Sequence, residues 1–191
     1  MSAKATFNQV TLSPLDPRDQ EQFITANQTA FNYGALEEFG LRDDHFEEDG
    51  NVISRDTIRE AISAGTAFRI IADGKPAGGV VIRTAGNRGY LDLLFVTPEL
   101  HSRGIGAAAW QAVERMHPEI TVWETVTPYF EKRNIHFYVN RLGFRIVEFF
   151  NSHHPDPHEP EAEGTGNSRS GHSGPPDEMF RFEKEIKLPS R

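Results

Sequence analysis

The sequence contains no cysteine. This excludes a disulfide framework, and it also excludes a mechanism in which a cysteine carries an acyl group between two substrates. Long apolar runs are missing as well, and residues 1–12 hold one lysine and no continuous hydrophobic core. We therefore expect neither a membrane span nor a signal peptide, and we expect a cytoplasmic protein.

Positive charge is also scarce, because 20 Lys and Arg stand against 28 Asp and Glu, for a net charge of −8. This balance argues against nucleic acid or an anionic membrane surface as the main partner. With 191 residues, 37% of them hydrophobic, the chain is long enough to bury a core. We expect one domain that spans residues 1–191.

The most informative stretch is the apolar run at residues 91–96, which is followed by Pro98 and by Arg-Gly-Ile-Gly at residues 103–106. The run predicts a buried strand, which Pro98 ends because it lacks a backbone donor. Apolar residues then recur at helical spacing, so a helix should begin at about Gly104. A helix N-terminus with glycines lets a phosphate approach free backbone amides. The stretch is thus a candidate phosphate loop, although Gly-x-Gly alone also fits a plain strand-to-helix turn.

A second motif lies downstream, with Asn-x-x-x-Tyr at residues 134–138 and Leu-Gly-Phe at residues 142–144. Together with Val-x-Pro at residues 96–98 and the Arg-Gly-x-Gly segment, it resembles the GNAT superfamily of acyl-CoA-dependent N-acyltransferases. The similarity is close over residues 80–150. A dinucleotide fingerprint fits less well, because Ala109 replaces its third glycine. His101 departs from the family pattern, which usually has Gln or Arg there.

The expected order of elements agrees with this resemblance. We expect a first strand at residues 6–12, a helix that starts after Asp16 and ends near Gly34, and a second helix between Ser54 and Gly65. A hairpin at residues 68–84, the central strand, a strand at residues 120–126, a helix at residues 134–142 and strands at residues 144–150 and 179–186 complete the chain. The fold class is α/β (α+β), with a GNAT-like mixed, mostly antiparallel central sheet flanked by helices. The resemblance implies that this sheet is splayed between its fourth and fifth strands.

The resemblance also implies acetyl-CoA as the co-substrate. Its pantetheine arm would lie in the splay like a strand, bonded to the main chain of Val96, and a backbone N–H near Phe95 would polarise the thioester carbonyl. The cofactor-binding residues expected on this basis are Leu94, Phe95, Val96, His101, Ser102, Arg103, Gly104, Ile105, Gly106, Ala107, Asn134 and Tyr138.

Acetyl transfer to an amine needs a neutral amine and a proton for the departing thiolate. Tyr138 matches the family tyrosine that serves as the general acid, although its helical spacing also fits a core residue. Asn134 either caps its helix or contacts the cofactor. Glu124, beside the expected gap, is our first candidate for the base, and Asp92 on the central strand is the second. Either acid can instead orient the substrate or be structural.

Two segments have an unusual composition. Residues 34–53 are acidic, which fits a solvated surface or, given the resemblance, a pocket for a cationic amine. The acids there are Glu37, Glu38, Asp43, Asp44, Glu47, Glu48 and Asp49. Residues 151–177 are rich in Pro, Gly and Ser, and we expect a mobile insertion between the last two strands. Its His153, His154, Asp156 and His158 can bind metal, but the prolines between them favour a stiff extended chain, so we expect no metal site.

These observations predict an N-acetyltransferase that moves an acetyl group from acetyl-CoA directly to a primary amine of a small-molecule or peptide acceptor, in a ternary complex. We expect a monomer or a homodimer. The alternative is a catalytically silent acyl-CoA-binding module that regulates through a partner. The presence of Tyr138 and of the strand acids favours the enzyme, since a pure binder needs neither.

Overall fold

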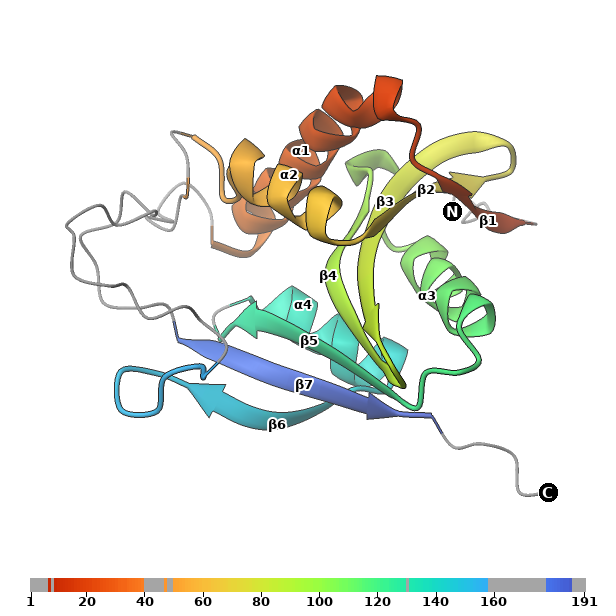
Figure 1. The fold of residues 1–191 in the computed structure, drawn as a ribbon. Coiled ribbons are helices and arrows are strands. Elements are labelled where there is room, and N and C mark those ends of the chain that lie inside the picture. The colour runs from red at the N-terminus through yellow and green to blue at the C-terminus, as the bar shows by residue number, and fades with distance from the viewer. Residues whose placement is uncertain are drawn as a thin grey trace, which may run out of the picture.

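The computed structural model describes residues 7, 9–39, 47, 50–129, 131–157 and 178–186. Seven strands form one sheet in the order β1-β2-β3-β4-β5-β7-β6 (Figure 1). They are β1 (Val10–Pro14), β2 (Thr66–Ala72), β3 (Lys75–Ala85), β4 (Arg88–Val96), β5 (Val122–Pro128), β6 (Arg145–Phe150) and β7 (Met179–Glu185). The helices are α1 (Gln20–Phe39), α2 (Arg55–Ala64), α3 (Ile105–Met116) and α4 (Lys132–His136), which continues as the π-helical turn η4 (Phe137–Leu142).

The sheet is antiparallel except where β4 meets β5, and this junction is short. The two strands pair in parallel over three positions, from Arg88 opposite Val122 to Tyr90 opposite Glu124. The Thr125 hydroxyl then donates to the Leu91 carbonyl at 2.8 Å, and beyond this bond the strands diverge into a fork that is plain in Figure 1. The predicted fold class, including the splay between the fourth and fifth strands, is confirmed.

Helices cover both faces of the sheet. α1 and α2 lie over β2–β4 on one face, where Phe23, Ile58 and other apolar side chains pack on Leu93 and Phe95 (Figure 1). On the other face, Trp110 of α3 and Tyr138 of η4 join Trp123 and Phe182 in a second core cluster. The face of β5 and β7 that lies opposite η4 instead carries charged side chains, which continue onto β3 and β4 through Arg83, Arg88 and Asp92. We call this surface the open face.

The predicted helix boundaries near caps are confirmed. Asp16 accepts a hydrogen bond from the Arg18 backbone at the start of a 3₁₀ turn that leads into α1. Ser54 caps α2 by accepting from the Thr57 amide, and Gly65 ends that helix. Pro98 begins a 3₁₀ turn directly after β4, as its missing donor requires.

Several predicted boundaries are wrong. The first helix does not end near Gly34 but continues to Phe39. A Cβ at residue 34 would lie at an ordinary contact distance of 3.7 Å from the Arg133 guanidinium, and Gly34 lies inside the helix rather than at its end. The helix predicted at residues 134–142 starts at Lys132 and widens into a π turn, and β1 begins at Val10 rather than at residue 6.

Parts of the two unusual segments lie outside the described residues, namely 40–46, 48–49 and 158–177, together with the side chains of residues 36–39. Glu47 is described, and its carboxylate accepts from the Ser54 amide at 3.0 Å and the Thr57 hydroxyl at 2.6 Å, at the N-terminus of α2. His154 pairs with Glu148 at 2.7 Å. Within the described ranges, no helix is long and apolar enough to cross a bilayer, and no group of three or more His, Asp or Glu is placed to hold a metal ion. The mobility of the insertion and the single-domain assignment stay predictions.

Candidate active site

A cleft of about 650 Å³ opens at the fork, between the end of β4, the loop that leads into α3, and the inner sides of α1 and α4. The structure brings together on its lining every residue predicted to bind the cofactor except Tyr138. These are Leu94, Phe95, Val96, His101, Ser102, Arg103, Gly104, Ile105, Gly106, Ala107 and Asn134. A sequence motif and a strand end thus form one continuous wall.

The loop before α3 turns sharply to expose backbone amides. Ser102 and Gly104 have positive φ angles of 61° and 81°, and Gly104 precedes the first turn of α3. The amides of a first helical turn have no acceptor within the helix, and the helix dipole adds partial positive charge there. The loop therefore provides several donors and a favourable potential for an anion at the wall of the cleft.

Gly106 is required for space rather than for conformation. A Cβ at this position would lie 3.0 Å from Cζ of Phe137 and 3.7 Å from Cγ2 of Val96. The aromatic ring of η4 is thus held directly against the first turn of α3, and both line the cleft.

His101 ties the loop to its neighbours. An Arg133 guanidinium nitrogen lies 2.6 Å from Nδ1 of His101, and Nε2 lies 2.7 Å from the Val96 carbonyl oxygen. Because a guanidinium can only donate, Nδ1 is the acceptor and Nε2–H donates to Val96. Tyr33 of α1 packs edge-on against the same imidazole at 5.3 Å. The histidine that departs from the family pattern therefore links β4, α1 and α4.

Sequence reasoning missed the basic wall that faces this loop. Arg133 and Arg141 line the cleft together with Phe137, and the three are spaced by four residues, so they share one side of α4 and η4. That spacing was the available signal. With Arg103, they make the cleft cationic, and Glu131 is the one acidic residue on its lining among the residues that the structure describes. Local charge is thus opposite to the chain's net charge.

Asn134 lies on the lining but does not cap its helix. Glu131 occupies the N-cap position, and Asn134 sits within the first turn, where its Nδ2 donates to the Glu131 carboxylate at 3.0 Å. The capping alternative is therefore wrong, and cofactor contact stays a prediction.

Tyr138 points away from the lining and into the core. Its ring packs against Phe182 and Phe144 at 5.5 and 5.9 Å, and 9% of the residue is exposed. Burial raises the pKa of the Tyr138 phenol to about 12, and a hydrogen bond with Thr125 offsets part of that rise. Since Thr125 in turn bonds to Leu91, the phenol ends at the point where β4 and β5 part.

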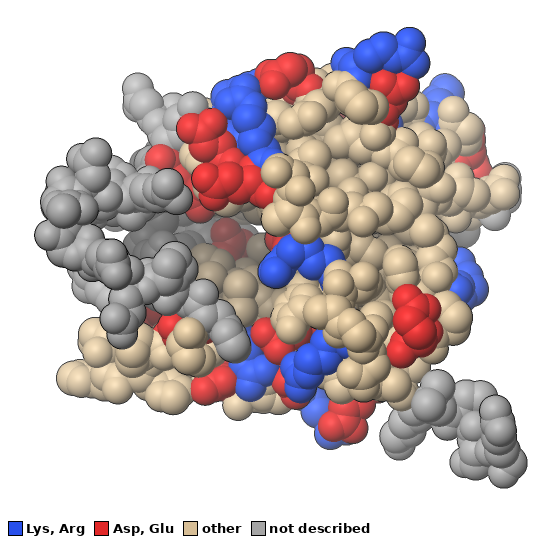
Figure 2. Space-filling model, in the orientation of Figure 1, with Lys and Arg blue, Asp and Glu red and all other residues tan. Residues whose placement is uncertain are grey.

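The two candidate bases lie on the open face and differ in how they are bound. Both Asp92 oxygens accept from Arg83, at 2.7 and 2.8 Å. Glu124 accepts hydrogen bonds from Arg88 at 3.2 Å and from Arg181 at 3.1 Å, and both bonds go to the same oxygen, Oε2. Over the described ranges its Oε1 has no hydrogen-bond partner. Figure 2 shows the acidic and basic side chains interspersed over β7, where Arg181 also pairs with Glu183.

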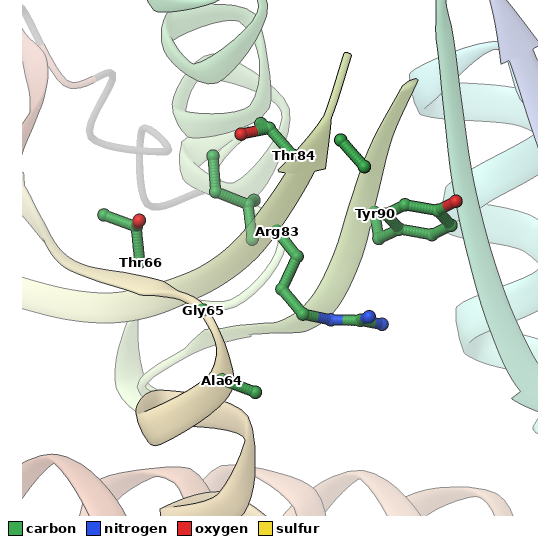
Figure 3. A pocket seen from close by; sticks show the side chains of 8 residues that line it. Ala64, Gly65, Thr66, Arg83, Thr84 and Tyr90 are labelled. Carbon is green, nitrogen blue, oxygen red and sulfur yellow. The ribbon is translucent and has the colours of Figure 1, made fainter. Parts of the chain in front are cut away.

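A smaller pocket of about 300 Å³ lies beside the end of α2 (Figure 3). Thr66, Thr84 and Arg83 contribute to its lining, and the Arg83 guanidinium lies over the Tyr90 ring at 5.0 Å while it holds Asp92. Its one cation is therefore already paired, and we assign no chemistry to this pocket.

A sheet that forks after its fourth strand, with an amide-rich helix N-terminus at the fork, is the architecture of the GNAT fold. The model of the acetyltransferase (GNAT) family matches residues 29–144 of this chain. The chain belongs to this family.

Similar proteins agree with this assignment. The uncharacterized protein YrkN of Bacillus subtilis (strain 168) is 47% identical over 144 residues, which cover 73% of this chain and 75% of YrkN. Among solved structures, the PaiA N-acetyltransferase of Thermoplasma acidophilum in complex with coenzyme A has a TM-score of 0.61 at 15% identity, over 93% of this chain and 99% of that one. Arabidopsis thaliana Naa50 in complex with the bisubstrate analogue CoA-Ac-MVNAL has a TM-score of 0.58 at 15% identity, again over 93% and 99%. At these identities the structures show the shared fold.

Proposed function

We propose that the protein transfers an acetyl group from acetyl-CoA directly to a primary amine of a small-molecule or peptide acceptor, within a ternary complex. The observation that carries this proposal is the fork itself. β4 leaves β5 after three paired positions and then runs along a cationic cleft that ends at the free amides of α3. A strand edge next to an anion site suits a long ligand with amide groups in its arm and phosphates at its far end.

The residues present fit acetyl-CoA, which supplies an activated thioester when it is bound. The amides of residues 103–107 would hold its pyrophosphate, and Arg103, Arg133 and Arg141 would balance the phosphate charge. The main chain of Val96 would pair with the pantetheine arm, and a backbone N–H near Phe95 would donate to the thioester carbonyl oxygen. The second lone pair of the Val96 carbonyl remains available beside the His101 bond.

Glu124 is the better candidate for the group that receives the amine's proton. Transfer forms a C–N bond and breaks the C–S bond, the nitrogen gives up a proton, and the sulfur gains one. Asp92 has both oxygens engaged by Arg83, whereas Glu124 keeps Oε1 for an amine N–H. The arginines on its other oxygen fix the carboxylate in one orientation, so an amine that enters from the open face meets a positioned acceptor.

Tyr138 is proposed as the acid that protonates the sulfur, with its phenol at the fork next to Thr125. Its raised pKa keeps the phenol protonated throughout the neutral range, as a donor requires. Its burial in the core equally suits the competing function, an acyl-CoA-binding module without catalysis, because such a module needs the ring but not the hydroxyl.

The names of similar proteins support an amine acceptor, since one solved neighbour is an N-acetyltransferase with bound CoA and another holds a CoA–peptide bisubstrate analogue. We also propose for this chain a cationic acceptor, a cytoplasmic location and a monomeric or homodimeric state.

The test is a thiol-release assay with acetyl-CoA and a panel of amines: putrescine, spermidine, L-lysine and a short peptide with a free N-terminus. We expect acceptor-dependent release of CoA for at least one amine, together with an acetylated product by mass spectrometry. Acetyl-CoA binding in calorimetry without release for any amine would leave the binding module as the function. If acetyl-CoA does not bind at all, both the acetyltransferase and the binding-module functions are wrong.

A further inference from the structure

Asn27 is a buried amide whose two polar atoms are unsatisfied. The residue is 0% exposed, and neither Oδ1 nor Nδ2 has a hydrogen-bond partner within the ranges that the structure describes. Leaving a buried donor or acceptor unpaired costs about 1–3 kcal/mol, so native proteins rarely do it without a reason.

The position of Asn27 on α1 supplies a reason. Phe23, one turn earlier, packs edge-on against Phe95 with 5.1 Å between ring centroids. Ala30 and Phe31, one turn later, line the cleft beside Phe95, and Gly34 follows on the same side. Residues three and four apart share one side of a helix, so Asn27 lies on the stripe that faces β4, one turn before Ala30 and Phe31, which line the cleft.

The adjacent residue shows that α1 can satisfy a buried amide. Gln28 is 7% exposed. Its Nε2 donates a hydrogen bond to the Ile53 carbonyl at 3.1 Å, and its Oε1 accepts one from Arg55 at 3.4 Å. Two neighbouring amides on one helix thus differ in one respect: Gln28 is bonded to the protein, and Asn27, on the stripe that faces β4, is not.

We propose that Asn27 contacts the acyl end of bound acetyl-CoA, with Nδ2–H donating a hydrogen bond to the acyl oxygen. This rests on the proposed function, in which the phosphates lie at the N-terminus of α3 and the acyl group lies at the opposite, inner end of the cleft, next to Phe95. Negative charge grows on that oxygen as the C–N bond forms. Asn27 then adds a side-chain donor from α1 to the backbone donor of β4, so two elements hold the same oxygen.

The test compares Asn27→Leu with Gln28→Leu, and the readouts are melting temperature, the dissociation constants of acetyl-CoA and CoA, and kcat with the best amine of the panel. Leucine at position 27 removes the unpaired amide and keeps the number and branching of the side-chain heavy atoms. We expect an equal or higher melting temperature, unchanged affinity for CoA, an approximately 5-fold loss of preference for acetyl-CoA over CoA, and a fall in kcat of about 10²-fold. Gln28→Leu should lower the melting temperature and leave the preference and kcat as in the wild type.

Each result decides between the possibilities. If Asn27→Leu keeps the wild-type preference for acetyl-CoA and the wild-type kcat, the inference is wrong while the proposed function stands. If no amine is acetylated by the wild type, the proposed function fails, and the ratio of the two dissociation constants still tests Asn27. Should Asn27→Leu fail to fold, Asn27→Ala provides the same measurements in a site without overpacking.

Discussion

The two sides of the fork between β4 and β5 are built in different ways. The cofactor side is formed mainly by consecutive residues, from the end of β4 through the loop into α3, and it presents backbone donors and basic side chains. The open face is formed by single side chains from β3, β4, β5 and β7, which hold one another in ion pairs. The first side therefore depends on the local chain, whereas the second depends on contacts between side chains from different strands.

The largest effect is expected where the two sides meet, at Tyr138. In Tyr138→Phe the ring keeps its contacts with Phe144 and Phe182 and only the hydroxyl is lost. If the phenol protonates the thiolate, kcat should fall about 10²–10³-fold with little change in the KM for acetyl-CoA. Because the pKa is about 12, the wild-type rate should show no alkaline decline from this group at ordinary assay pH. A near-normal kcat would make Tyr138 a core residue.

Much of the cofactor side could be predicted from the sequence, because its determinants are local. Pro98 ends a strand, Gly104 takes a left-handed conformation before a helix, and both act through neighbouring residues. The open face could not be predicted in the same way. The preference for Glu124 over Asp92 depends on which oxygens Arg83, Arg88 and Arg181 reach, and these contacts span up to 57 positions in the chain.

The orientations of Phe137 and Tyr138 could not be predicted from the sequence either. The motif predicts a helix with an aromatic pair, but it does not state which ring faces the cleft. The π turn rotates the side chains relative to a regular helix, so Phe137 meets Gly106 and Tyr138 enters the core. Asn27 gave no sequence signal at all, since a lone polar residue on a helix is ordinarily a surface residue.

The next prediction separates the two acids of the open face. Glu124→Gln keeps the shape but loses the charge, and we expect kcat to fall about 10²-fold if Glu124 receives the amine's proton. Asp92→Asn is the matched variant, and it should lower stability through loss of the Arg83 pair while kcat changes less. The measurements are kcat as a function of pH and urea unfolding for both. Equal loss of kcat in the two variants would show that the whole ion-pair network, rather than Glu124, supports the reaction.

Burial of Tyr138 also predicts how stability depends on alkaline pH. The phenol ionises near pH 10 in the unfolded chain and near 12 in the folded one. Its contribution is therefore complete below pH 10 and is lost as the pH rises to 12, because the unfolded state releases its proton first. Tyr138→Phe should avoid this loss, which amounts to roughly 2 kcal/mol at about pH 11.5. Denaturant unfolding at pH 8 and 11.5 measures it, with Tyr129→Phe, a 48% exposed residue, as the control. Parallel losses in wild type and Tyr138→Phe would contradict the buried phenol.

The smallest effect concerns the cofactor side alone. In Gly106→Ala the new methyl group would lie 3.0 Å from the Phe137 ring, so the ring, which lines the cleft, has to give way by a few tenths of an ångström. Overpacking of this kind costs about 1–3 kcal/mol, and we expect affinity for acetyl-CoA in calorimetry to fall about 10-fold.

The second substitution Phe137→Leu removes the atoms that clash, and the double variant should regain most of the lost affinity. Gly104→Ala is the contrasting control. A Cβ there meets nothing within 4 Å, but the φ of 81° strains any side chain by about 1–2 kcal/mol. Since that strain lies in the backbone, Phe137→Leu should not relieve it. Rescue of both glycine variants, or of neither, would mean that Gly106 acts through the loop conformation, and the steric contact between α3 and η4 would lose its role in shaping the cleft.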